Sequence, residues 1–311
     1  METRATPRLS STHASSDLDV ANAAPIRRPW LWIVSAIVLV LAAQLIIGIV
    51  TNKNFEWHTV AQYITAPMIL KGLATTLVLA AICMLLGIIL GLIVAAFQRS
   101  RIPVLHATGV TYVWIFRGLP VLVQLIFWFN LGALLPHLSI GIPFGPEFAS
   151  WPTSTLVTAS VAAVLGLSLN EGAYMAEIIR AGLLSVEVGQ YEAAQALGFG
   201  RAHTFRRILL PQAMRFIIPP TGTQVINMVK GTSLVSVIAM ADLLYSAQIV
   251  YNRTFETIPL LVVACLWYLI VTSVLYGAQS LLERRFSRGA SRRAGPARRL
   301  RATALDPKAV A

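Results

Sequence analysis

The sequence predicts an all-α integral membrane protein with about six transmembrane helices and both termini in the cytoplasm. Composition is the first reason: 56% of the 311 residues are hydrophobic and only 12% are charged, with a mean hydropathy of +0.70. The second is a series of long apolar windows, because a helix that crosses the roughly 30 Å hydrocarbon core needs about 20 mostly apolar residues. The third is the uneven distribution of Lys and Arg between successive loops.

Six windows reach the length of a membrane span. They cover residues 30–50, 69–97, 105–135, 154–179, 221–244 and 258–282. The third window is interrupted by Arg117, Gly118 and Pro120. Because Pro120 has no N–H to donate to the carbonyl of Phe116, we expect this helix to kink there. The fifth window is the least hydrophobic of the set.

The first window follows Arg27 and Arg28, as the apolar part of a signal peptide would. Such a region holds about 7–15 apolar residues close to the N-terminus, whereas this window begins at Trp30 and is as long as a full span. We therefore expect an additional transmembrane helix at 30–50. Residues 1–29 are rich in Ser, Thr, Ala, Pro and Arg without apolar periodicity, which predicts a disordered cytoplasmic tail.

The orientation follows from the basic residues. Most of the 25 Lys and Arg residues fall in the segments 1–29, 98–104, 180–220 and 284–311, which alternate with segments that hold almost none. Basic loops stay in the cytoplasm, so both termini are predicted inside and residues 284–311 form a basic cytoplasmic tail. The net charge of +12 is then a topology signal and an attraction to anionic membrane lipid, and it does not indicate nucleic-acid binding.

The sequence lacks the motifs of common catalytic sites. No Lys is followed by Ser or Thr, so the chain has no GxxxxGK[ST] loop to bind ATP. The five His residues are scattered, and Cys83 and Cys265 both lie in apolar windows. We expect no catalytic residues, no bound cofactor and no metal site in this chain.

The loop at 180–220 differs from the others because it has a regular pattern. Residues 190–198 consist of strong helix formers followed by Gly198, where a helix would end. Residues 201–210 again have helical apolar spacing, and Pro211 is expected to break or kink the helix at that point. The loop is either a generic amphipathic surface hairpin or a rigid short helix that another protein grips.

Seven residues of this loop resemble a known signature. Glu192-Ala193-Ala194, Gly198, Ile208 and Leu210-Pro211 are spaced as in the EAA motif of type I permeases of binding-protein-dependent ABC importers. Other segments resemble the polar amino-acid branch of that family, the histidine, glutamine and arginine type: Lys71-Gly72 with Thr75-Thr76-Leu77, Phe116-Arg117-Gly118-Leu119-Pro120 with Val123-Gln124, Asn170 with Gly172-Ala173-Tyr174 and Ala176-Glu177-Ile178, Lys230-Gly231-Thr232-Ser233-Leu234, and Arg284-Arg285.

The resemblance implies a five-helix permease core at 69–283 with an extra N-terminal span at 30–50. It implies a multi-pass protein of the bacterial inner membrane that takes up polar amino acids. Its partners would be a separate ABC ATPase subunit dimer that binds ATP, an extracytoplasmic solute-binding protein, and a second permease subunit, either identical or paralogous. The segment 180–220 would be the coupling loop, and its EAA residues would dock on the ATPase.

Ionisable side chains inside a membrane are costly and usually pair or line a path. Glu177 and Arg180 can form a helix-surface pair. An α-amino acid carries an ammonium and a carboxylate, so Glu171 and Lys230 are candidates for the substrate path, with Asn170 and Arg117. The alternative is that Glu171 and Lys230 pair structurally. At two positions the chain departs from the family pattern: Glu171 stands where Ser or Thr is frequent, and Gly231 where Asp is common.

Two other functions remain open from sequence. The chain could be an ion-coupled secondary amino-acid carrier, with Glu171, Glu177 and Asp242 as proton or sodium sites. It could also be a membrane receptor or scaffold whose basic tail binds acidic lipid. Gly87 and Gly91 form a Gly-xxx-Gly pattern, which we interpret as a site of close helix packing.

Overall fold

The computed structural model describes residues 29–142 and 147–287. The predicted N-terminal tail, apart from Pro29, and most of the predicted C-terminal tail lie outside these ranges. The chain divides into two compact units, Met1–Lys53 and Asn54–Ala311. In the first unit the described chain is chiefly α1 (Pro29–Thr51), an apolar helix at the place of the first window.

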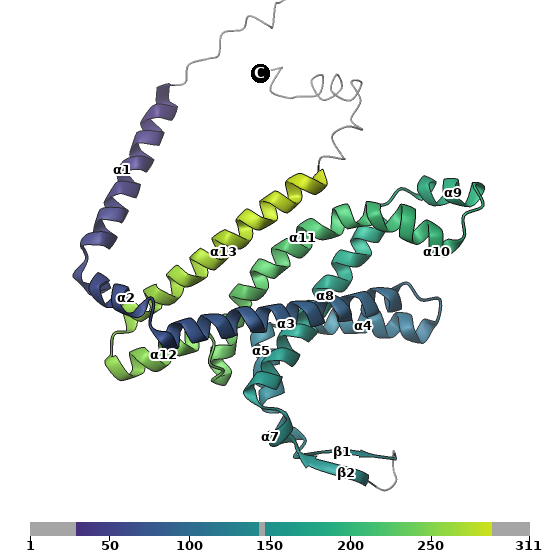
Figure 1. Ribbon diagram of the computed structural model, residues 1–311, viewed down its shortest axis with the longest axis horizontal. Helices are drawn as coiled ribbons and strands as arrows, with labels where there is room; N and C mark the ends of the chain where they lie inside the picture. Colours follow the sequence, from purple (N-terminus) through teal and green to yellow (C-terminus); the bar gives the residue numbers. More distant parts are fainter. Residues whose placement is uncertain (1–28, 143–146, 288–311) are drawn as a thin grey trace, which may run out of the picture. The chain divides into compact units, whose positions relative to one another are not determined.

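The remaining described chain is helical apart from one β-hairpin (Figure 1). Its elements are η2 (Lys53–Phe55), α2 (Trp57–Tyr63), α3 (Pro67–Gln98), α4 (Pro103–Gly118), α5 (Val121–Phe129), α6 (Leu131–Leu134), β1 (His137–Gly141), β2 (Glu147–Pro152), α7 (Thr153–Leu156), α8 (Ala159–Leu184), α9 (Val188–Ala196), α10 (Arg201–Thr204), η3 (Phe205–Leu209), α11 (Leu210–Gly231), η4 (Thr232–Ile238), α12 (Leu243–Thr254) and α13 (Thr257–Ser287). The all-α prediction is confirmed, with a two-stranded sheet as its one addition in the described part.

Within the described residues, three helices are long and apolar enough to cross a membrane: α1, α3 and α13. Two bent helix pairs raise this number to as many as five if each pair is one span. The fourth predicted span corresponds to α8, which is long enough at 26 residues but contains Asn170, Glu171, Glu177 and Arg180. The total of six spans and the position of the termini stay predictions.

The pairing of α3 with α8 forms the centre of the second unit. Gly87 and Gly91 on α3 face Glu171 and Met175 on α8. A methyl group at Gly87 would come within 2.6 Å of Cγ of Glu171, and one at Gly91 within 2.5 Å of Cβ of Met175. Since carbon atoms pack no closer than about 3.5 Å, only glycine fits at these positions. The packing interpretation of the Gly-xxx-Gly pattern is confirmed.

The third window is broken where Pro120 predicted a kink. Helix α4 ends at Gly118, α5 begins at Val121, and the chain bends by 100° between them. The carbonyl of Phe116, which Pro120 cannot satisfy, accepts hydrogen bonds from Nε2 of Gln124 (3.1 Å) and Nδ2 of Asn170 (2.8 Å). The kink is stable because side chains replace the missing backbone donor.

The fifth window does not form one continuous helix over 221–244, and this expectation is corrected. Helix α11 begins at Leu210, inside the predicted loop, and the chain bends by 44° before α12. Ala239 adopts a left-handed conformation with φ 58° at the break. Asp242 then starts α12, because its carboxylate accepts a hydrogen bond from the N–H of Tyr245 at 2.8 Å.

The stretch between the third and fourth windows contains a β-hairpin that the sequence did not predict. Strands β1 and β2 pair antiparallel, with Leu138 opposite Trp151 and Ile140 opposite Ala149. Thr153 closes its base, because the N–H of Thr153 donates to the carbonyl of Pro136 at 2.9 Å. The hairpin precedes α8, whereas α9 comes after it, so these two elements lie at opposite ends of α8 (Figure 1).

Candidate functional site

Helix α9 carries the Glu192-Ala193-Ala194 segment and ends as the sequence predicted. The N–H of Phe199 donates to the carbonyl of Ala194 at 3.0 Å, and the N–H of Gly198 donates to the carbonyl of Gln195 at 2.9 Å. This is the Schellman arrangement, which requires a left-handed residue after the helix. Gly198 supplies it with φ 75°.

The three adjacent residues of this segment have different environments. Ala194 is only 2% exposed and lies on the side of α9 that packs against η3. Glu192 and Ala193 are exposed, as is Gly198 at the end of the helix. Glu192 lies in the middle of α9, so it does not cap its own helix. One short helix therefore carries an exposed acid, Glu192, and an exposed small residue, Ala193, and it ends in a sharp turn at Gly198.

From Arg201 the chain is helical through Pro211, but with one widened turn. Residues Phe205–Leu209 form a π-helical turn, in which the N–H of Leu210 donates to the carbonyl of Phe205. Pro211 is one of the first residues of α11 and is exposed, while Ile208 and Leu210 are half-buried. Instead of the expected break at Pro211, the helix has a π turn that ends at Leu209. This agrees with the sequence, because proline has no N–H to complete a regular helical turn.

A side-chain bridge joins α9 directly to α11. Nε2 of Gln212 donates to Oε1 of Gln190 at 3.2 Å and to the carbonyl of Ile208 at 2.9 Å. The start of α11 is therefore tied to α9 by a side-chain hydrogen bond. The predicted loop at 180–220 is therefore mostly helical and continuous with a membrane segment.

A charged cluster joins three helices near the end of α8. Glu177 accepts hydrogen bonds from Nη2 of Arg180 at 2.7 Å and from Nε2 of Gln98 at 3.1 Å. Nη1 of Arg117 lies 3.9 Å from Oε2 of Glu177, and its guanidinium lies 5.2 Å from the ring centre of Tyr174. The predicted pair of Glu177 and Arg180 is confirmed, and Arg117 extends it to α4.

The other candidate path residues are not brought together. Glu171 is 6% exposed between α3 and α8, and its Oε1 atom has no hydrogen-bond partner. Lys230 is exposed near the end of α11, and the described residues contain no ion pair between the two. Asn170 has a structural contact, its bond to the carbonyl of Phe116. The structural pair of Glu171 with Lys230, which was the alternative to a role in the substrate path, is not formed.

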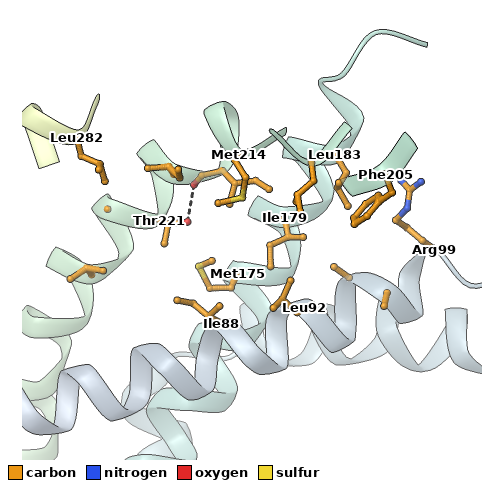
Figure 2. A pocket seen from close by; sticks show the side chains of 17 residues that line it. Ile88, Leu92, Arg99, Met175, Ile179, Leu183, Phe205, Met214, Thr221 and Leu282 are labelled. Carbon is orange, nitrogen blue, oxygen red and sulfur yellow. Dashed lines mark hydrogen bonds between the residues drawn. The ribbon is translucent and has the colours of Figure 1, made fainter. Parts of the chain in front are cut away.

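A pocket of about 930 Å³ lies between α3, α8 and α11, with Leu282 of α13 at its margin (Figure 2). Its wall is almost entirely apolar. The polar side chains in it belong to Arg99, at the end of α3, and Thr221, whose hydroxyl donates to the carbonyl of Ile217 at 2.7 Å. None of the four candidate path residues lines it, so by itself it does not offer the charges that an α-amino acid needs. Phe205 and Leu210 extend it up to the α9–α11 segment.

Sequence reasoning missed the structural role of Asp242. This residue is fully buried, caps α12, and accepts a hydrogen bond from the hydroxyl of Tyr268 at 3.2 Å. An Asp immediately before an apolar helical run is the usual signal for an N-cap, and Asp242 precedes Leu243 and Leu244. Within the described chain, no group of three His, Cys, Asp or Glu residues is placed to hold a metal ion.

Comparisons with known proteins agree with this architecture. Residues 87–288 match the family model of the binding-protein-dependent transport system inner membrane component. The chain is 42% identical over 273 residues to the arginine transport system permease protein ArgU of Corynebacterium glutamicum, covering 87% of this chain and 84% of that one. It is 37% identical over 233 residues to the octopine transport system permease protein OccM of Rhizobium radiobacter, covering 75% and 89%.

A solved structure is similar to this chain in both sequence and fold. A chain from the crystal structure of an amino acid ABC transporter with histidines matches with a TM-score of 0.60 and 34% identity, over 70% of this chain and 94% of that one. A chain of the MetNI methionine ABC transporter matches in fold, with a TM-score of 0.53 and 18% identity. The chain therefore belongs to the family of inner-membrane components of binding-protein-dependent transport systems, and it is a multi-pass permease subunit of an ABC transporter.

Proposed function

We propose that this chain forms half of the membrane path of an importer for polar amino acids of the arginine class. The names of its relatives support the substrate class, because they include transport permeases for arginine, octopine, glutamine and L-cystine. The relatives are permeases, so ATP hydrolysis is assigned to a separate ATPase subunit. An extracytoplasmic solute-binding protein would deliver the amino acid.

The observation that carries the proposal is the geometry of α9. It is a short helix in which Glu192 and Ala193 are exposed, and the left-handed Gly198 ends it. Small residues on an exposed helix let another protein's backbone approach closely. Through Gln212 and Ile208, α9 is joined to the start of α11. We infer that the ATPase grips α9 and that its movement reaches the membrane through α11.

One chain offers one such helix, whereas an ATPase dimer offers two docking grooves. We therefore propose that two permease chains assemble, either two copies or one copy with a paralogue. The membrane path then lies where the two chains meet. This fits the apolar lining of the pocket between α3, α8 and α11, which holds none of the candidate path residues.

For the substrate path, Arg117 and Lys230 are now the stronger candidates, because both side chains are exposed in the single chain. Arg117 also lies over the ring of Tyr174, which holds its guanidinium in place. Glu171 would reach a solute only if α3 and α8 separated. A cationic substrate would need an acidic partner, and Glu177, which already binds Arg117 and Arg180, is the acid nearest to Arg117 in the charged cluster.

The test is reconstitution of the permease with its ATPase in liposomes, with the solute-binding protein added outside. Uptake of labelled arginine should require ATP and the solute-binding protein, and it should continue when ion gradients are collapsed. Uptake driven by a proton or sodium gradient without ATP would instead establish the secondary carrier. If ATP-driven uptake occurs only with a different amino acid, the coupling proposal holds and the substrate class is wrong.

A further inference from the structure

A buried polar junction lies where α12 meets α3 and α13. Asp242 and Thr76 are both fully buried there. The carboxyl group of Asp242 accepts hydrogen bonds from the N–H of Tyr245 at 2.8 Å and from the hydroxyl of Tyr268 at 3.2 Å. The N–H of Leu243 donates to Oγ1 of Thr76 at 3.0 Å. The first turn of α12 is therefore bonded to two other helices, to α3 through Thr76 and to α13 through Tyr268.

The same three helices are also closely packed at this junction. A methyl group at Gly72 on α3 would come within 2.7 Å of the carbonyl oxygen of Asp242, so only glycine allows this approach. Ile69, Leu243 and Leu260 belong to one buried apolar cluster that joins α3, α12 and α13. Among the described residues Asp242 has no Lys or Arg partner, so hydrogen bonds and packing hold its side chain. Burial strengthens these hydrogen bonds, because water does not compete for them.

The junction lies at one end of the segment that contains α11. Helix α11 continues into η4, which ends at the left-handed Ala239 shortly before α12. Thr232, the first residue of η4, is fully buried and lies within hydrogen-bonding reach of the Tyr268 hydroxyl. At its other end α11 is bonded to α9, because Gln212 donates to Gln190. Helix α11 therefore connects α9 with the buried junction.

We propose that Asp242 is a positioning residue for transport, which holds the far end of α11 and η4 against α13 through Tyr268. This inference rests on the proposed coupling through α9. A helix that is displaced at one end and held at the other tilts about the held end, as in a hinge motion. With the Asp242–Tyr268 bond in place, a displacement of α9 tilts α11 and changes the pocket between α3, α8 and α11. Without this bond, α11 and η4 shift together, and ATP is hydrolysed with little transport.

Three substitutions separate the bond to Tyr268 from the cap of α12. Tyr268→Phe removes the hydroxyl and leaves the cap intact. Asp242→Ser keeps a good helix cap, but its single oxygen on a short side chain cannot also reach Tyr268. Asp242→Asn retains both contacts, because its amide oxygen can cap α12 and its NH2 group can donate to the tyrosine oxygen. Tyr276→Phe on the same helix is the matched control, since Tyr276 is 54% exposed.

The measurement is the number of arginine molecules taken up per ATP hydrolysed by the full transporter in liposomes, with the solute-binding protein added outside. We expect Tyr268→Phe and Asp242→Ser to lower this ratio about fivefold, the factor that corresponds to one lost hydrogen bond, while ATP hydrolysis changes by less than about twofold. Asp242→Asn and Tyr276→Phe should keep the ratio of the unsubstituted permease.

An unchanged ratio in Tyr268→Phe and Asp242→Ser would overturn the proposal, even if their melting temperatures fall, because the bond would then serve stability alone. A loss in Asp242→Asn as large as in Asp242→Ser would also contradict it, since the amide retains the hydrogen bonds. If Asp242→Ser misfolds, Tyr268→Phe still decides the matter, because it removes a single oxygen atom. Uptake by the unsubstituted permease that needs no ATP would contradict the coupling itself, whereas ATP-driven uptake with an unchanged ratio in the variants contradicts only the role of Asp242.

Discussion

At the scale of single residues, the carbonyl of Phe116 shows how a broken membrane helix is stabilised. An unsatisfied carbonyl in a bilayer is costly, and Pro120 leaves this one without its usual donor. Gln124 from α5 and Asn170 from α8 both donate to it. Asn170 therefore holds the bent segment against α8, whatever its role toward a substrate.

Replacing Asn170 by Asp should destabilise the permease. A carboxylate has nearly the shape of the amide but donates no N–H, so Phe116 would lose one donor and face a negative oxygen. We expect a loss of about 1–3 kcal/mol, seen as a lower melting temperature of the purified protein. Asn130→Asp is the matched control, because Nδ2 of Asn130 bonds a carbonyl of its own helix at an exposed site. Equal shifts for the two variants would contradict this account.

Local chemistry predicted the kink at Pro120 and the helix end at Gly198, since each depends on one residue's backbone. It did not predict that Asn170 would bond to Phe116, because that partner is 54 residues away in the sequence. Glu171 and Lys230 were grouped by charge alone. In the structure Glu171 lies between α3 and α8, whereas Lys230 is exposed. Hydropathy windows do not distinguish these two environments.

At the scale of helices, the contact between α3 and α8 depends on small residues. Gly87→Leu should force the two helices apart, because even a methyl group there would come within 2.6 Å of the Glu171 side chain. Overpacking of this kind costs about 1–3 kcal/mol, and we expect a reduced melting temperature and a reduced yield of folded protein. Gly277→Leu on α13 is the control, because nothing lies within 4 Å of that position. A stable Gly87→Leu variant would show that the contact is less tight than described.

The end of α9 gives a prediction about coupling. Gly198→Val places a β-branched residue at φ 75°, which L-residues of this kind avoid, so the exit of the helix should change direction. We expect the assembled transporter to lose ATP-driven uptake while the permease still inserts in the membrane. Gly189→Val adds the same side chain to the same helix, where nothing lies within 4 Å. Uptake that is unchanged in Gly198→Val would argue against α9 as the coupling helix.

The elements that sequence windows missed share a physical cause. Hydropathy identifies long apolar helices such as α3 and α13, but it averages over a break. The window at 221–244 therefore merged α11, η4 and α12, although Ala239 and Asp242 end one element and start the next. The hairpin was missed because its strands are short and depend on pairing between residues that are separated in sequence.

At the scale of the whole molecule, the first unit lies outside the part of the chain that the family model matches. The family model matches residues 87–288, and the solved amino acid transporter chain covers 70% of this protein. Contacts within the chain also separate Met1–Lys53 from the remainder. Helix α1 lies outside the residues that the family model matches, and the loops of the second unit carry topology signals of their own, with Arg99 and Arg101 after α3 and the basic residues of α10 and η3 after α8.

Deleting residues 1–53 should leave the orientation of the core unchanged. The deletion removes one span, so the new N-terminus at Asn54 would lie outside, while the basic segments after α3, α8 and α13 still favour the cytoplasm. A reporter at the C-terminus that fluoresces only in the cytoplasm should therefore remain active. The control carries the same deletion with Arg99→Gln and Arg101→Gln, which weakens the first internal signal and should produce mixed orientations. A C-terminus moved outside by the deletion alone would mean that α1 directs the topology of the whole chain, because the basic loops of the core would then be insufficient to orient five spans.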